Sequence, residues 1–382
     1  MLNDLRQKTE RIMTEPDTGT SGLGAVLCAI SKGYAAVIRW RNRLYDRNMF
    51  RSRRLDGFVI SIGNITMGGT GKTPMTIYLA RLLKRAGCNV VILSRGYRGE
   101  AENIGGIVSD GSRLCMTPTA AGDEPYMMAA SLKNVPVLVG RDRFENGRLA
   151  VDTFSPDVIL LDDAFQHRKL ARDMDLVLLD GSRPLGNGRL FPGGVLREPP
   201  ESLKRADACI LTRWDPGTGC NMQSIRNFSG KAPVFKTRHV PCIHKVVGSS
   251  ESRPAQEFGS AEVSPEILNG RRAFAFSGIA RNSDFLSTVK GFGCRVVGSM
   301  PFQDHHWYSE TDRVRIAEAA YDAGADLILT TEKDYVRIAC PVTRSVSWPV
   351  PLVVIGIDIS FDEDEERFVR FIMNQLPPNH KT

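Results

Sequence analysis

A glycine-rich segment between two hydrophobic stretches limits the folds open to this chain more than any other feature. Residues 63–74 read GNITMGGTGKTP, with the apolar run FVISI before them and a helical pattern over 74–86 after them. A strand, a turn ending in Gly-Lys-Thr and a helix form a phosphate-binding loop, because backbone N–H groups and the helix N-terminus then point at one anion. The general pattern has an earlier glycine where this chain has Thr66. The segment still predicts a nucleotide-binding loop.

The residues of this loop have distinct expected roles. Lys72 is placed to reach the β- and γ-phosphates, and it counts as a catalytic group because it stabilises the phosphate in transfer. Thr73 is placed to bring its hydroxyl to Mg²⁺. The expected nucleotide contacts are consecutive in the chain: Thr66, Met67, Gly68, Gly69, Thr70, Gly71, Lys72 and Thr73.

Two aspartates follow another apolar run. The segment VILLDDAFQH (158–167) has four apolar residues before Asp162 and Asp163. A phosphate-binding loop needs a carboxylate at the end of a neighbouring strand to hold the water shell of Mg²⁺. We expect Asp162 to support the metal and Asp163 to orient a substrate or nucleophile. Which of the two touches Mg²⁺ directly stays open. Gln166 is expected to orient the nucleotide. No guanine-specifying NKxD motif follows a strand, so ATP is favoured.

Short apolar runs alternate with helical patterns from residue 58 onward, which predicts a parallel sheet with helices on both faces. We expect an α/β fold: a P-loop NTPase-like, mostly parallel sheet flanked by helices, with a second, smaller α/β portion. The expected strands are 58–62, 89–93, 135–139, 158–161, 175–179 and 208–212, then 273–279, 295–299, 326–331 and 351–358. The expected helices are 74–86, 282–290, 309–323 and one opened by 362–366.

The positive charge is concentrated near the N-terminus. The formal net charge is +7, and residues 39–54 contain seven arginines and one acid, Asp46. Residues 23–38 place apolar side chains at steps of three and four, as on one face of a helix, but the run is shorter than the roughly 20 apolar residues of a membrane span. Two interpretations remain open. The helix packs on its own domain, or it lies in the headgroup layer of an anionic membrane with Trp40 and Tyr45 at the interface.

Composition and motif content exclude several classes of protein. With 42% hydrophobic and 24% charged residues in 382, the chain is neither disordered nor a polytopic membrane protein. Its eight cysteines form no CxxC pair, which disfavours zinc ribbons and favours a reducing compartment. No nucleic-acid-binding motif accompanies the arginines, so nucleic acid is not an expected partner.

A series of motifs resembles one family, the tetraacyldisaccharide 4′-kinases of the lipid A pathway in Gram-negative bacteria. The resemblance spans residues 23–358 in order and at compatible spacing. The family's usual DDGFQH is DDAFQH here, with Ala164 in place of glycine, which leaves both aspartates in place. The motifs are GNITMGGTGKTP (63–74), SRGYRG (94–99), GDEP (122–125), GRDR (140–143), DDAFQH (162–167), GNGRLFPGGVLREP (186–199), FSGIARNSDF (276–285), FQDHHWY (302–308) and TTEKD (330–334).

This resemblance implies a kinase that uses ATP and Mg²⁺ to phosphorylate the 4′-hydroxyl of an acylated glucosamine disaccharide 1-phosphate. It also implies a peripheral enzyme on the cytoplasmic face of the inner membrane, attached through the N-terminal amphipathic helix. The expected partners are this lipid and an anionic membrane surface, with no obligate protein partner evident. The expected domains are an extension (1–22), a basic amphipathic helix (23–56), a P-loop kinase core (57–235), a linker with a variable loop (236–270) and the second α/β portion (271–382).

The resemblance also implies roles for residues outside the loop. Asp123 of GDEP is the expected base for the acceptor hydroxyl, and His305 of FQDHHWY is expected to pair with it. The residues alone favour a helix N-cap for Asp123, because Asp-Glu-Pro commonly opens a helix. By resemblance, Glu198 is a further expected metal contact.

Three arginines follow strand ends at the edge where open α/β folds bind ligands, namely Arg95, Arg141 and Arg143. They are expected to contact ATP phosphates or the substrate's 1-phosphate, with surface salt bridges as the alternative. Zinc is not expected at His305 and His306, because further ligands at metal-site spacing are lacking. His306 is expected to be structural, and a structural role is as plausible for His167. Residues near the nucleotide from the second portion are expected to be Thr331, Glu332 and Asp334.

Two other functions remain open from the sequence. One is a P-loop ATPase or synthetase of the dethiobiotin-synthetase or partition-ATPase kind, which would hydrolyse ATP without this acceptor or activate a carboxylate. The other is a membrane-docked nucleotide switch that binds a protein. Dependence of ATP turnover on a lipid disaccharide distinguishes the kinase from both.

Overall fold

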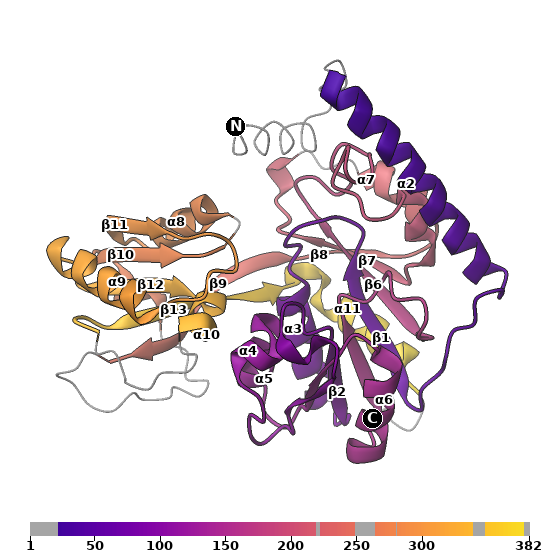
Figure 1. The fold of residues 1–382 in the computed structure, drawn as a ribbon, viewed down its shortest axis with the longest axis horizontal. Coiled ribbons are helices and arrows are strands. Elements are labelled where there is room, and N and C mark those ends of the chain that lie inside the picture. The colour runs from indigo at the N-terminus through magenta and orange to yellow at the C-terminus, as the bar shows by residue number, and fades with distance from the viewer. Residues whose placement is uncertain (1–21, 219–221, 249–263, 280, 339–347, 378–382) are drawn as a thin grey trace.

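The computed structural model describes residues 22–218, 222–248, 264–279, 281–338 and 348–377, which form two lobes, each built on its own sheet (Figure 1). Apart from Gly22, the expected extension lies outside the described residues, as do residues 249–263 of the expected variable loop. The P-loop NTPase-like α/β fold with a second α/β portion is confirmed.

The first lobe contains an eight-stranded sheet in the order β3-β4-β2-β5-β1-β6-β7-β8. Every neighbouring pair is parallel except β3 and β4. The phosphate-loop strand β1 lies between β5 and β6, so both neighbours end at the same edge as the loop. The strands are β1 (Phe58–Asn64), β2 (Val90–Ser94), β3 (Gly106–Ser109), β4 (Val137–Val139), β5 (Val158–Asp162), β6 (Met174–Asp180), β7 (Ala208–Thr212) and β8 (Val234–Lys236).

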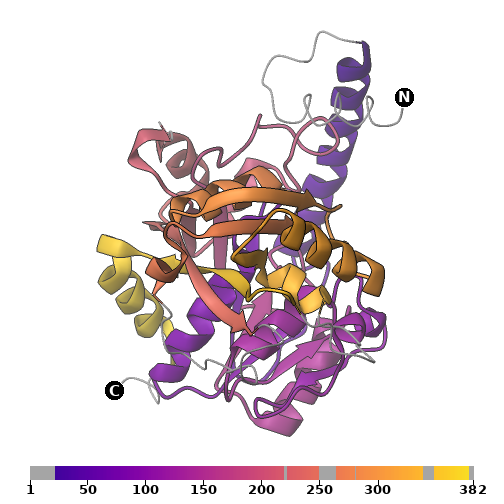
Figure 2. The ribbon, with the colours of Figure 1, turned by 90° about the vertical axis from the view of Figure 1, so that its left-hand side faces the viewer.

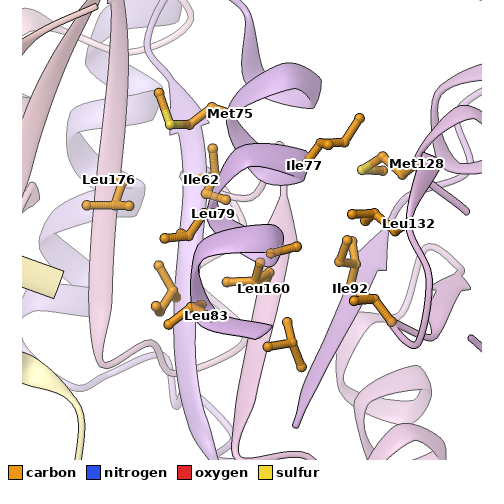
Figure 3. Packing of buried hydrophobic residues seen from close by; sticks show 14 of the residues in the cluster. Ile62, Met75, Ile77, Leu79, Leu83, Ile92, Met128, Leu132, Leu160 and Leu176 are labelled. Atoms are coloured by element: carbon orange, nitrogen blue, oxygen red, sulfur yellow. The ribbon is translucent and has the colours of Figure 1, made fainter. Parts of the chain in front are cut away.

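Helices cover both faces of this sheet. On one face, Leu79 and Leu83 of α3 pack on Ile62 and Leu160 of the central strands (Figure 3). On the other face, α6 packs through Ala150, and α2 and α7 contribute to a second cluster. The burial of each such leucine stabilises the fold by about 2 kcal/mol. The helices of this lobe are α2 (Gly22–Asp46), α3 (Lys72–Arg85), α4 (Pro118–Ala121), α5 (Asp123–Ser131), α6 (Arg143–Phe154) and α7 (Met222–Ser229).

The second lobe contains a five-stranded sheet in the order β11-β10-β12-β13-β9. Its pairs are parallel except for β9, which runs antiparallel to β13. Its strands are β9 (Arg238–Val247), β10 (Arg272–Ser277), β11 (Arg295–Pro301), β12 (Leu327–Thr331) and β13 (Leu352–Ser360). Its helices are α8 (Asn282–Gly291), α9 (Glu310–Asp322) and α10 (Glu332–Ile338).

Two elements cross the expected domain boundaries: β9 lies in the expected linker (236–270), and α11 lies in the expected second portion (271–382). The range expected as a linker contains β9, an edge strand of the second sheet. β9 is half-exposed and contains Pro241, a residue that edge strands tolerate. Its sequence therefore lacks the continuous apolar run that marks an inner strand. The final helix α11 (Glu365–Gln375) belongs by sequence to the second portion but buries Phe368 and Ile372 against the first lobe beside Phe235.

The N-terminal helix α2 has 25 residues and lies along the edge of the first lobe (Figure 1). Its best 18-residue window has a mean hydropathy of 1.3, and 22% of that window is buried, so by length and composition alone it is able to cross a membrane. The helix is longer than the apolar run of residues 23–38, because it continues into the basic stretch. Figure 2 shows the N-terminal half of α2 reaching beyond the two sheets.

Candidate active site

The glycine-rich loop joins β1 to α3, and Lys72 is the first residue of the helix. The Nδ2 atom of Asn64 donates a hydrogen bond to Oγ1 of Thr70 at 2.9 Å, which closes the loop on itself. Gly71 has a φ of 81°, and a Cβ there would lie 2.7 Å from Nε2 of His239. Only glycine fits this position, because the backbone is left-handed and the imidazole already occupies the space.

A segment from the family motif 186–199 supports the loop from the side. The backbone N–H of Met67 donates to the carbonyl of Val195 at 2.6 Å, and that of Arg197 donates to the carbonyl of Ile65 at 2.7 Å. The side chain of Arg213 donates to the carbonyl of Gly69 at 2.7 Å. These contacts hold the loop backbone in place before any nucleotide binds.

Asp162 and Asp163 stand at the end of β5, directly beside the loop strand, with Ile62 opposite Asp162. Asp162 is buried and accepts hydrogen bonds from Oγ1 of Thr76 at 3.4 Å and Oγ of Ser94 at 3.2 Å. Oδ2 of Asp163 lies 3.8 Å from Nζ of Lys72, and both carboxylate oxygens accept from Arg197 at 3.1 Å. The two aspartates therefore serve different partners.

Their surroundings also separate their pKa values. Burial, followed by the charges of Glu124 and Asp163, raises the pKa of Asp162. Burial would raise the pKa of Asp163 as well, but Lys72 and Arg197 outweigh it and hold that pKa below its usual value. Asp162 is thus a buried carboxylate in negative surroundings, which a cation would stabilise.

This donor set fits Mg²⁺, which prefers carboxylate, hydroxyl and phosphate oxygens. Thr73 is the second residue of α3, and Asp162 contacts Thr76 about one turn further along the same helix. Within the described residues, Lys72 and Arg197 form ion pairs with Asp163 but not with Asp162, on which Lys72 and Arg143 act electrostatically without a direct contact.

Asp123, at the start of α5, meets the second lobe. Its Oδ2 lies 3.2 Å from Nδ1 of His305 and accepts hydrogen bonds from Nε of Arg337, at 3.1 Å, and from a second guanidinium nitrogen. Gly122 occupies the N-cap position and Asp123 is the first helical residue. The N-cap interpretation of Asp123 is therefore wrong, because its side chain bridges the lobes.

Asp123 is ionised despite being buried. Burial alone would raise its pKa, but the hydrogen bond with His305 and the charges of Arg337 and Lys333 hold that pKa well below its usual value. The neighbouring Glu124 pairs with Lys333, whose charge lowers the pKa of Glu124. Glu124 also interacts electrostatically with Lys72 of the phosphate loop and with Asp162.

The three arginines expected at the substrate differ in exposure. Arg95 is half-exposed and donates to Glu102 at 2.7 Å, while Arg141 is exposed and its backbone N–H donates to the carbonyl of Glu102. Arg143 is buried, donates to the carbonyl of Gly140 at 2.8 Å, and acts electrostatically on Asp162 and Asp163. Its burial lowers its pKa to about 10. Arg95 and Arg141 are thus accessible to a ligand, whereas Arg143 lies in the interior.

Glu198 and Gln166 connect the site to α2. Glu198 is fully buried and accepts hydrogen bonds from Asn42 and Arg205, each at 2.8 Å. Gln166 donates to the carbonyl of Asn64 at 2.8 Å, and its own carbonyl accepts from Arg41 at 2.5 Å. The metal contact of Glu198 and the nucleotide contact of Gln166 stay predictions. Their contacts in the structure are structural ones.

Other expected residues have internal partners. His306 stacks on Phe302 at 4.8 Å and pairs with Asp312, and burial lowers the pKa of His167 to about 4. Asp334 is buried and accepts from the hydroxyls of Thr331 and Tyr308.

Sequence reasoning missed Lys333 and Arg337. They lie four residues apart on α10, so both face α5. A signal existed, because the TTEKD motif starts a helix whose next turn carries Arg337. Nothing local pointed to His239, which burial keeps neutral by lowering its pKa to about 4.

The comparisons with known proteins agree over nearly the whole chain. A family model described as tetraacyldisaccharide-1-P 4′-kinase matches residues 23–377. The tetraacyldisaccharide 4′-kinase of Desulfatibacillum aliphaticivorans is 40% identical over 98% of this chain and 99% of its own, and that of Geobacter sulfurreducens is 41% identical over 84% and 86%. The crystal structure of an "apo" form of LpxK from Aquifex aeolicus in complex with ATP has a TM-score of 0.72 and 33% identity, covering 93% of this chain and all of that one. The chain belongs to the tetraacyldisaccharide-1-phosphate 4′-kinase family.

Proposed function

We propose that this chain phosphorylates the 4′-hydroxyl of tetraacyldisaccharide 1-phosphate with ATP, using a site formed between its two lobes. The family, the named relatives and the ATP complex of a similar chain support the reaction. The observation that carries the site assignment is the contact of Asp123 with His305 of the second lobe, next to Glu124, which interacts electrostatically with Lys72 of the phosphate loop. An acceptor hydroxyl between these groups and the loop would face the γ-phosphate.

The residues of the first lobe hold the nucleotide. Backbone N–H groups of the loop and the N-terminus of α3 bind the phosphates. The ammonium of Lys72 stabilises the negative charge of the γ-phosphate during its transfer. Asp163 pairs with both the ammonium of Lys72 and the guanidinium of Arg197, which positions Lys72 at the loop. Thr73 and Asp162 would hold Mg²⁺, which when bound spreads the negative charge of the transferring phosphoryl group.

Asp123 accepts the hydrogen bond, and then the proton, of the acceptor hydroxyl. Its low pKa is compatible with this role, because the transition state of phosphoryl transfer is loose and the hydroxyl loses its proton late. His305 fixes the orientation of the carboxylate and stabilises the proton that it receives. Arg95 and Arg141, the accessible arginines near this edge, would bind phosphate oxygens of ATP or of the 1-phosphate.

The lipid acceptor requires the enzyme to work at a membrane, and α2 has a suitable surface. Ser31, Ala35 and Ile38 face the protein, whereas Val26, Ile30, Val37 and Trp40 are 53–61% exposed. The basic stretch continues from this apolar face, as in helices that lie on anionic lipid. We propose that α2 places the enzyme peripherally on the cytoplasmic face of the inner membrane, where ATP is available.

The test is transfer of radiolabelled γ-phosphate from ATP to purified tetraacyldisaccharide 1-phosphate in detergent micelles with Mg²⁺. We expect labelled lipid with the unaltered chain and none with Lys72→Ala, while Lys231→Ala, at an exposed lysine, retains the activity. ATP hydrolysis without labelled lipid would contradict the kinase assignment and favour an ATPase or a nucleotide switch.

A further inference from the structure

Four potential metal ligands or supporting groups meet on the strands that run toward the junction of the lobes. Cys242 and His244 lie two residues apart on β9, so they share one face of the strand. Asp358 lies on the paired strand β13, and Glu332 is the first residue of α10. The ligand atoms of Cys242, His244 and Asp358 all lie within 4.8 Å of one another.

The individual distances suit one shared ion. Sγ of Cys242 is 3.3 Å from Oδ2 of Asp358, and Nε2 of His244 is 3.8 Å from Oδ1 of the same carboxylate. Ligands about 2.0–2.3 Å from a tetrahedral zinc ion are separated by comparable distances. The other ring nitrogen, Nδ1 of His244, is hydrogen-bonded to Oε1 of Glu332.

An irregular strand pairing and a glycine bring these side chains together. The register of β9 and β13 shifts between Val354 and Ile355, and Cys242 pairs with Gly356. The His244 ring lies over Gly356, where a Cβ would come within 2.4 Å of its atoms. The irregular register re-aims the histidine, and the glycine leaves room for it.

We propose that Cys242, His244 and Asp358 form a binding site for a divalent transition metal of the zinc class. Glu332 orients the imidazole through Nδ1, as second carboxylates do in histidine-ligated metal sites. Three protein ligands leave a fourth position for water. A thiolate and an imidazole select zinc-like ions over Mg²⁺, which prefers oxygen ligands, so this site is separate from the one at Asp162.

Carboxylates meet both ring nitrogens of His244, Glu332 at Nδ1 and Asp358 at Nε2, so the cluster already concentrates negative charge around the imidazole. The cation that faces the cluster from the phosphate-loop helix is Arg81, 3.4 Å from Asp358.

The position of the site gives it a structural consequence. Glu332 begins the helix whose next residue, Lys333, pairs with Glu124 and which also carries Arg337. Asp358 contacts Arg81 on the helix that follows the phosphate loop. A bound ion would therefore fix α10 relative to β9 and β13, and α10 carries the Arg337 that contacts Asp123.

The experiment is a Co²⁺ titration of the reduced, full-length chain in excess Mg²⁺, followed by absorption spectroscopy. We expect one equivalent of Co²⁺ to produce a sulfur-to-cobalt charge-transfer band that Zn²⁺ abolishes. Cys242→Ser should lose the band, and Glu332→Gln should weaken binding about 10- to 100-fold. The matched control is Cys115→Ser, at an exposed thiol, which should leave the band unchanged.

The proposal is overturned if the unaltered chain shows no thiolate–cobalt band, if Cys242→Ser keeps it, or if Cys115→Ser removes it. Circular dichroism and ATP binding of Cys242→Ser show whether the variant is folded. If Cys242→Ser is unfolded, His244→Asn is used in its place. This variant should keep the thiolate–cobalt band but bind Co²⁺ at least tenfold more weakly. An unchanged Co²⁺ affinity would overturn the proposal. These readouts do not depend on the kinase reaction.

Discussion

Arg337 is the residue whose importance the structure changes most. It is 1% exposed and donates to the carboxylates of Asp123 and Asp334 and to the carbonyl of Gly278. Two nitrogens of its guanidinium donate to Oδ2 of Asp123, which holds that carboxylate in one orientation. We therefore regard Arg337 as a positioning residue for Asp123.

The first prediction concerns this positioning. Arg337→Lys keeps the charge but loses the two-nitrogen contact, so kcat should fall about tenfold to a hundredfold with KM for ATP nearly unchanged. Arg337→Gln should also move the acid limb of the kcat–pH profile to higher pH, because the pKa of Asp123 is then less depressed. Arg315→Lys, at an exposed arginine of α9, is the control. Equal kcat in Arg337→Lys and the unaltered enzyme would remove the proposed role.

The second prediction concerns the proposed base. Asp123→Asn removes the proton acceptor while keeping the size of the side chain, so kcat should fall about 10²- to 10⁴-fold. ATP binding, measured by calorimetry with Mg²⁺, should change little, because Asp123 contacts His305 and Arg337 rather than the loop. Unchanged turnover would show that another group accepts the proton.

At the scale of elements, the sequence predicted the strands around the loop well, because inner parallel strands are continuous apolar runs. It did not predict which side of α2 faces the protein. The helix docks through small or polar residues, and Ser31 accepts a hydrogen bond from the backbone N–H of Gly193 at 2.7 Å. A helix that docks through Ser31 and Ala35 leaves much of its apolar surface free, which periodicity alone cannot reveal.

The third prediction concerns that free surface. Replacing Val26, Ile30 and Val37 together by serine should weaken binding to anionic phospholipid vesicles by more than tenfold, since each buried aliphatic side chain contributes about 1.5–3 kcal/mol. Ala36→Ser, at an exposed alanine of the same helix, is the control, and vesicle co-sedimentation is the measurement. Vesicle binding that survives the triple replacement would contradict attachment through this face.

At the scale of the whole molecule, charged pairs and shared elements join the two lobes. Asp123 pairs with Arg337 and Glu124 with Lys333, while α11 packs its apolar face on the first lobe although it follows β13 of the second. Figure 1 shows β9 and β13 running between the lobes. The proposed active site is therefore assembled only when the lobes are in contact.

The fourth prediction is a pH dependence of this assembly. The folded-state pKa values of Asp123 and Glu124 lie below their unfolded values of about 4. Their contribution to the free energy of unfolding is therefore complete at neutral pH and is lost as the pH falls below about 4 through the folded pKa values. Urea unfolding at pH 7 and pH 3 should show the destabilisation caused by Glu124→Gln shrinking at the lower pH. A pH-independent difference would contradict this contribution.

The sequence by itself determined the phosphate loop, the aspartate pair after β5 and the alternation of strands and helices. Each of these depends on neighbours in the chain: glycines that permit the turn, an apolar run that forms an inner strand, and a helix directly after Lys72. Only the tertiary structure decided the partners of Asp123, because Arg337 lies 214 residues away in the sequence. It also decided the docking of α11 and the meeting of Cys242 with Asp358, since burial and strand register arise from the packing of distant segments rather than from local pattern.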